Sequence, residues 1–211
     1  MTDVALYLPG FLAAYAILLV GASSPGPAVA MLMGIASSQG RAPALITCLG
    51  IAAGSATLNI LTLMGVGLIL SQAAWAMTAL RVLGAAYLAY LAYGAFRKAL
   101  APPHITAQTV APLSAKAAFA KGYALQITNP KAIAFWLAIA AVAATDGGGW
   151  LVITAFVLGA ALISFLCHGV WALLLSSRAV RIAYQKARAW IEGALGAFFA
   201  FAAFKLATTR I

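Results

Sequence analysis

The residues Ser-Ser-Pro-Gly-Pro at positions 23–27 interrupt an apolar run that extends from about residue 7 to residue 35. Each proline lacks a backbone N–H, and its ring clashes with the preceding turn, so regular helix cannot continue through it. The residue before each proline is also pushed out of the α region. In lipid a freed carbonyl needs a partner in protein, water or ligand. We therefore expect this break to face the protein interior or a water-filled cavity.

The composition around this stretch indicates a membrane protein. Of the 211 residues, 65% are hydrophobic and 8% are charged, whereas average chains have about 25% charged residues. About 20 helical residues cross the apolar core of a bilayer, and six runs approach or exceed that length. They lie at about 7–36, 42–70, 74–96, 118–143, 149–175 and 190–207. Because Met1 to Asp3 include no basic residue, no cleavable signal peptide is expected.

The net charge of +10 is explained by membrane topology better than by a nucleic-acid partner. Lys and Arg gather in the cytoplasmic connectors of membrane proteins. One side of the predicted spans has Arg41, Arg97, Lys98, Lys116, Lys121, Arg178, Arg181, Lys186 and Arg188, and the other has only Lys205 and Arg210. This places both termini outside the cytoplasm. The 176–189 link mixes basic and apolar residues, which fits a segment on the membrane surface or a solvated loop equally well.

A second break, Asn-Pro-Lys at residues 129–131, interrupts the fourth apolar run. A linker at about 99–116 divides one transmembrane domain, residues 1–211, into two repeats at about 1–98 and 117–211. Three spans per repeat give the repeats opposite orientations. The predicted fold is an all-α membrane protein of six transmembrane helices, arranged as two inverted three-helix repeats whose first helices are broken. Paired breaks of this kind indicate a transporter's binding site; two structural proline kinks are the alternative.

Lys131 follows the second break directly, near the centre of its span. A cation there costs about 2.5–3.5 kcal/mol, so it should face the interior. It is expected to bind a substrate carboxylate or to take part in proton movement, and pairing with the freed carbonyls is the alternative. Asn129 is expected to cap the helix that follows it, whose N-terminus suits an anion. The predicted substrate-binding residues are Ser24, Pro25, Gly26, Pro27, Asn59, Gln126, Asn129, Pro130 and Lys131.

Span two has a polar face and a small-residue face. Ser55, Asn59 and Thr62 share one side by the helical period, either lining the transport path or bonding to another helix. Gly50 and Gly54 lie on the opposite side, as a pair suited to close helix packing. Such small-residue faces would also allow a homo-oligomer.

Two further features concern proton movement. His168 shares a face of span five with Ser164 and Trp171, and it is the second candidate for proton coupling. A packing role is the alternative. Glu192 can pair with Arg188 one turn away, and we expect a surface ion pair rather than a coupling carboxylate.

Enzyme chemistry is not supported. The chain has no phosphate loop of the GxxxxGK type and no HExxH, GxSxG or CxxC motif. Its acidic residues, three in all, lie near span ends or turns. Cys48 and Cys167 fall inside apolar spans, where they are expected to act as small apolar residues. We therefore expect no enzyme activity, no cofactor and no metal site.

These motifs resemble the lysine-exporter and threonine/homoserine-exporter (LysE/RhtB-type) family of bacterial amino-acid transporters. The resemblance rests on Ser-Pro-Gly-Pro at 24–27, Gly-Arg at 40–41 with Gly50, Leu-Gly-Ala-Ala-Tyr-Leu at 83–88, Gly122, and Asn-Pro-Lys-Ala at 129–132. It implies a small secondary transporter in the bacterial inner membrane that exports amino acids or related metabolites. It also implies proton-motive-force drive and alternating access at a midplane site where the two breaks meet.

The chain departs from the family at both breaks. Many members have an acidic residue after Pro-Gly-Pro, where this chain has Ala28, and a proline and phenylalanine motif where residues 138–144 are small and apolar. Without an acid beside the first break, neutral amino acids are favoured as substrates. Two alternatives compete with amino-acid export. One is an exporter of metal cations or other toxic solutes, although a soft-metal site would need clustered ligands. The other is a membrane assembly subunit that transports nothing.

Overall fold

The computed structural model describes residues 4–70, 74–102, 110–140 and 149–208, and within these ranges all regular structure is helical. A short 3-10 helix, Val4–Tyr7, precedes the α-helices. These are α1 (Leu8–Ser23), α2 (Pro27–Gln39), α3 (Arg41–Leu70), α4 (Ala74–Leu100), α5 (Ala115–Thr128), α6 (Pro130–Ala140), α7 (Trp150–Leu175) and α8 (Arg178–Thr208). The predicted all-α class is confirmed. The predicted end of span four at 141–143 and Arg210 lie outside the described residues.

Each predicted apolar run corresponds to one helix or to one broken pair of helices. The first run is the pair α1–α2, bent by 52° at residues 24–26, and the fourth is the pair α5–α6, broken at Asn129. Among the described residues, α3, α7 and α8 are long and apolar enough to cross a membrane, and α1–α2 together make a fourth candidate span.

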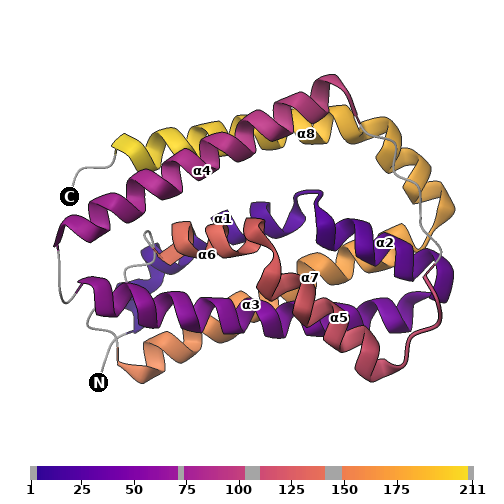
Figure 1. The fold of residues 1–211 in the computed structure, drawn as a ribbon, viewed down its shortest axis with the longest axis horizontal. Coiled ribbons are helices and arrows are strands. Elements are labelled where there is room, and N and C mark those ends of the chain that lie inside the picture. The colour runs from indigo at the N-terminus through magenta and orange to yellow at the C-terminus, as the bar shows by residue number, and fades with distance from the viewer. Residues whose placement is uncertain (1–3, 71–73, 103–109, 141–148, 209–211) are drawn as a thin grey trace.

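The basic 176–189 stretch differs from the expected connector, because α8 already begins at Arg178. Residues 178–192 contain neither glycine nor proline, and alanine, arginine, lysine and glutamine favour helix. A solvated loop is therefore the wrong alternative. Figure 1 shows the first turns of α8 rising at the edge of the molecule before the helix runs on beside α4.

The helices form layers around the two breaks (Figure 1). α4 and α8 lie side by side as one layer, and α3 packs against both α5 and α7 on the other side of the molecule. Between these layers, α6 contacts both α3 and α4, and Ile17 and Val20 of α1 pack against the apolar side chains of α4 and α8. Buried apolar side chains fill the space around the breaks, with Trp136 and Phe156 in one cluster, Leu32 and Ile51 in a second, and Phe199 in a third.

Glycines bring α3 and α5 into close contact. A Cβ built on Gly50 would overlap the Phe119 carbonyl oxygen, and one built on Gly122 would overlap the Thr47 carbonyl oxygen. The predicted close-packing role of the Gly50/Gly54 pair is confirmed. Because α5 covers this pair within the chain, it is not a face for a second copy. The glycine and polar sides are also less separate than expected, since Gln126 contacts Gly54 and hydrogen-bonds to Ser55.

Residues of the basic connectors are tied together at one end of the molecule. Gly40 ends α2 with φ of 88°, which side-chain-bearing residues rarely adopt. Arg41 Nε then donates to Ser176 Oγ at 3.0 Å, linking the start of α3 to the end of α7. The Gln39 amide nitrogen donates to the Ala111 carbonyl oxygen at 2.9 Å, and its oxygen accepts from the Leu113 backbone N–H at 2.9 Å. Residues 110–113 of the linker are thus fastened to α2.

Candidate functional site

The carbonyls freed at the first break find partners inside the protein. Pro25 and Pro27 have no N–H for the carbonyls of Gly21 and Ser23, their partners in a regular helix. Ser24 Oγ donates to the Gly21 carbonyl oxygen at 2.8 Å. Trp171 Nε1 on α7 donates to the Ser23 carbonyl oxygen at 3.2 Å. The break faces the interior as expected, and α7 supplies one of the replacement donors.

The Trp171 hydrogen bond should contribute measurably to stability. Trp171→Phe keeps an aromatic ring against Tyr184 but removes the N–H that serves the Ser23 carbonyl. Leaving this partly buried carbonyl without its donor costs about 1–3 kcal/mol, which lowers Tm by roughly 2–12 °C for a chain of this size. Thermal unfolding of purified protein in detergent would measure the change. Trp150→Phe is the control because Trp150 is 78% exposed. Equal Tm values for wild type and Trp171→Phe would contradict the assigned role.

The second break is capped by its own asparagine. Pro130 frees the Gln126 carbonyl, whose oxygen accepts from the Asn129 backbone N–H at 3.4 Å. Asn129 Oδ1 accepts from the Lys131 backbone N–H at 3.0 Å, the contact of an N-cap. The predicted cap is confirmed. The Ile133 backbone N–H donates to the Asn129 carbonyl oxygen at 3.0 Å, so Asn129 serves two N–H groups of the first turn of α6.

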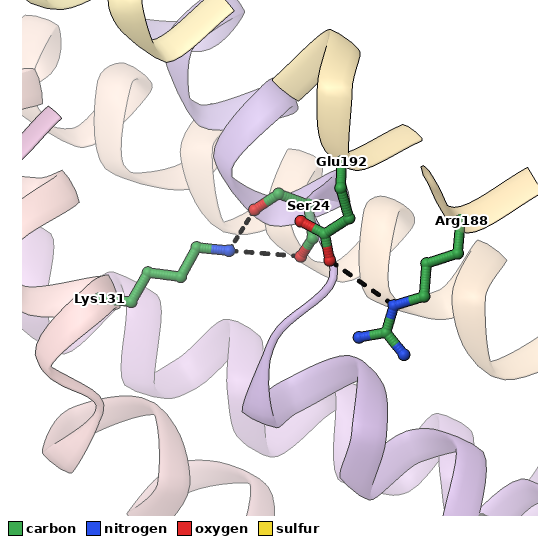
Figure 2. Close-up of polar contacts among 4 residues, drawn as sticks. All are labelled: Ser24, Lys131, Arg188 and Glu192. Carbon is green, nitrogen blue, oxygen red and sulfur yellow. Dashed lines mark hydrogen bonds and ion pairs between the residues drawn. The ribbon is translucent and has the colours of Figure 1, made fainter. Parts of the chain in front are cut away.

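Lys131 joins the two breaks. Its Nζ donates to the Ser24 carbonyl oxygen at 3.3 Å and also to Ser24 Oγ, as Figure 2 shows. The backbone is extended at Ser24 and Gly26, so the Ser24 carbonyl lies outside the helical ladder. A Cβ built on Gly26 would lie 3.4 Å from Nζ, which shows that the amine passes directly beside the first break. In this conformation Lys131 pairs with freed backbone, the alternative considered from sequence.

A cavity of about 50 Å³ lies where the breaks meet. Of the predicted site residues, it is lined by Ser24, Gly26, Pro27, Gln126, Asn129, Lys131 and His168. Pro25, Pro130 and Asn59 do not line it. Asn59 is 1% exposed, and its Nδ2 has no hydrogen-bond partner among the described residues. An apolar cavity of roughly 150 Å³ binds one benzene molecule, so the central cavity admits only a few water molecules and is too small for an amino acid.

A row of buried polar side chains lies beside this cavity and crosses three helices. Gln126 Nε2 on α5 donates to Ser55 Oγ at 2.8 Å, and Ser55 Oγ lies 3.0 Å from Ser164 Oγ on α7. His168 Nδ1 is 2.7 Å from the Ser164 carbonyl oxygen, and because a carbonyl only accepts, Nδ1 carries the hydrogen. Ser55 and Ser164 line the cavity, although sequence reasoning placed them only on polar helix faces.

A larger cavity lies on the other side of the first break. Its volume is about 250 Å³, and its polar side chains are Lys98, Tyr184 and Arg188. Pro25 lines it, and Gly26 and Pro27 line both this cavity and the central one. The Pro-Gly-Pro backbone is therefore the partition between the two spaces.

The ion pair predicted between Glu192 and Arg188 exists, but it is not on the surface. Arg188 Nε lies 3.7 Å from Glu192 Oε1, and the two side chains are 9% and 3% exposed. Helical spacing gave the pairing correctly. The exposure was wrong because α4 packs along this part of α8 and covers it.

Comparisons with known proteins extend over most of the chain. The family described as LysE type translocator matches residues 19–210. The threonine efflux protein of Escherichia coli (strain K12) is 31% identical over 195 residues, which are 90% of this chain and 93% of that protein. The threonine efflux protein of Salmonella typhi is 30% identical, covering 86% of this chain and 89% of its own. An uncharacterized membrane protein of Pseudomonas aeruginosa is 29% identical, with 89% of each chain covered. No solved structure gives a significant match.

Proposed function

Because the chain belongs to the LysE type translocator family, we propose that it exports neutral amino acids across the bacterial inner membrane in exchange for protons. The resemblance inferred from the sequence motifs is confirmed by the family match, and the protein is a transporter rather than an enzyme. What we propose beyond this is the transported substrate, the energy source and the transport mechanism.

The observation that carries this proposal is the meeting of both breaks at one cavity. Lys131 reaches from the second break to the first. It is placed to exchange the Ser24 carbonyl for the carboxylate of a substrate, with the N-terminus of α6 as a further anion-binding element. Asn129, which lines the cavity, would orient the substrate ammonium. Hydrogen bonds between ionised groups are stronger than those between neutral groups, so Lys131 alone would contribute both to the affinity for the substrate and to its orientation.

The electrostatics of the cavity favour amino acids with uncharged side chains. No carboxylate lines the central cavity among the described residues, while Lys131 does. A second positive charge on the substrate would have no counter-ion there. Two of the relatives are named threonine efflux proteins, which makes threonine the first substrate to test.

Transport requires the central cavity to enlarge. An amino acid does not fit in about 50 Å³, so the present conformation is closed around the site. Corresponding parts of the two proposed repeats pack on each other: α4 on α8, α3 on α7, and α1–α2 on α5–α6. This pairing supports inverted repeats, whose relative rocking opens a site alternately to each side. Displacement of Gly26 and Pro27 would join the central cavity to the larger cavity lined by Lys98 and Arg188.

The test is efflux from bacterial cells whose internal pools are raised with threonine-containing and lysine-containing dipeptides. Cells expressing the chain are expected to release threonine faster than cells with an empty vector. An uncoupler should remove the difference, and lysine release should match the empty vector. Equal release of every amino acid from both strains would refute amino-acid export. Threonine release that persists with the uncoupler would refute proton drive alone.

A further inference from the structure

Glu192 is the only acidic residue in the described ranges 4–70, 74–102, 110–140 and 149–208. It lies on α8, a candidate membrane span, and it is 2% exposed. A carboxylate inside a membrane protein is costly and persists when it is paired or functional. Its burial separates it from the surface ion pairs that contribute little to stability.

Positively charged side chains stabilise the charge on Glu192. The 3.7 Å between Arg188 Nε and Glu192 Oε1 is longer than a hydrogen bond. Glu192 Oε1 accepts no hydrogen bond from the described residues. The basic groups that act on this carboxylate are Arg188 on its own helix, Lys98 on α4 and Lys131 on α6. The effects of Lys98 and Lys131 depend on the distances between helices and change when the helices move.

The same cations belong to the two cavities at the first break. Lys131 contacts Ser24 and lines the central cavity. Lys98 and Arg188 line the larger cavity with Pro25, Gly26 and Pro27. In Figure 2 the Glu192 carboxylate lies between Lys131 and Arg188, at the level of Ser24. Any movement that opens the first break therefore changes the distances from Glu192 to Lys131 and Lys98.

We propose that Glu192 is the proton-binding residue of the transport cycle, an inference that rests on the proposed proton-coupled export. In the conformation described here, burial disfavours the charge on the carboxylate and the surrounding cations favour it. When helix movement withdraws Lys98 and Lys131, which lie on other helices, Arg188 alone remains beside the buried carboxylate. The carboxylate then takes up a proton from outside, forming one O–H bond. The return of the cations breaks that bond and releases the proton to water on the cytoplasmic side.

In this arrangement a bound proton disfavours binding of the substrate, and a bound substrate disfavours binding of the proton, as exchange requires. The ionised carboxylate offsets one positive charge near the site and favours the ammonium group of a bound amino acid. The protonated form does not, so proton uptake favours substrate release. Tyr184, which lines the larger cavity with Arg188, has an OH group without a hydrogen-bond partner among the described residues.

The test uses the purified full chain in liposomes and two assays of labelled threonine. One measures exchange between equal pools with no gradient, and the other measures accumulation driven by a pH gradient. With one proton per substrate, a gradient of one pH unit supports about tenfold accumulation. Glu192→Gln keeps the size of the side chain and removes the titratable group. We expect it still to exchange threonine, although at higher threonine concentrations than wild type needs because the carboxylate charge is missing, and to lose the driven accumulation.

The other outcomes overturn the inference in distinguishable ways. Driven accumulation by Glu192→Gln, or loss of both activities in a folded variant, would show that the residue is structural. Exchange without driven accumulation in wild type would remove proton coupling and leave amino-acid transport standing. No threonine transport by wild type would overturn the proposed function as well. If the glutamine variant does not fold, Glu192→Asp decides: its exchange should show a shifted pH profile, and an unchanged profile would overturn the assignment.

Discussion

Lys131→Ala is expected to reduce threonine efflux to the level of the empty vector while the protein is still made and inserted. The substitution removes the amine that bridges the two breaks. It thereby removes the group proposed to receive the substrate carboxylate. Hydrogen bonds to charged groups contribute about 1.5–3 kcal/mol, which corresponds to roughly 10–100-fold in affinity. The loss should therefore appear in cell efflux even when internal pools are high.

Two further variants separate the charge of Lys131 from its shape. Lys131→Gln keeps a donor for the Ser24 carbonyl but has no charge for a carboxylate, so it should be as inactive as the alanine variant. Lys131→Arg keeps the charge, but its planar fork does not fit the position of an ammonium, and the cavity of about 50 Å³ leaves little room. Partial activity is expected for this variant.

Lys121→Ala is the matched control, because Lys121 is an exposed lysine on the adjoining helix α5. Its efflux should equal that of wild type. Membrane levels of all variants would be compared by quantitative blotting, since a lower level would mimic a lower rate. Wild-type efflux from Lys131→Ala at a normal membrane level would show that the substrate is held elsewhere.

The parts of the site that could be predicted from sequence are those fixed by local backbone chemistry. A proline removes an N–H wherever it stands, so the two breaks and their interior placement follow from residues 23–27 and 129–131 alone. The Asn129 cap is equally local, since Asn129 Oδ1 bonds two residues along the chain. The i, i+4 pairing of Arg188 and Glu192 follows from helical spacing.

What could not be predicted depends on which helix faces meet. In a membrane protein both lipid and protein neighbours are apolar, so hydrophobic periodicity does not identify the buried face. Trp171 donates a hydrogen bond to a carbonyl oxygen 148 residues away in the chain, and no local sequence pattern predicts this pairing. The burial of Glu192 depends on α4 lying along α8. Asn59 shares a helix with Ser55 but does not reach the cavity that Ser55 lines. The residues that line the cavity are set by the place where α3, α5 and α7 meet, which helical spacing does not give.

The α3–α5 contact gives the second prediction with a large effect: Gly50→Ala or Gly122→Ala should each destabilise the fold severely. The added methyl group would overlap a backbone carbonyl oxygen of the facing helix, at Phe119 in the first case and at Thr47 in the second. A flexible side chain could move aside, but a helical backbone cannot do so alone. The two helices must separate.

Separation of α3 from α5 would also disturb the candidate site. The Gln126 to Ser55 hydrogen bond crosses this contact, and both residues line the central cavity. Overpacking a well-packed core costs about 1–3 kcal/mol, occasionally more, and a clash with backbone belongs at the upper end. The expected fall in Tm is roughly 6–12 °C for about 3 kcal/mol. Size-exclusion profiles and thermal unfolding in detergent would measure it, and efflux should fall with the amount of folded protein.

Gly65→Ala is the control that isolates packing from helix propensity. Gly65 lies on α3 like Gly50, but a Cβ built on it meets nothing within 4 Å. Replacing a helical glycine by alanine there should be neutral or should stabilise by about 0.5–1 kcal/mol. Opposite effects of one chemical change within one helix would establish that the α3–α5 contact, rather than glycine flexibility, requires Gly50. Similar stability of Gly50→Ala and Gly65→Ala would mean that the two helices are not held this close in the membrane.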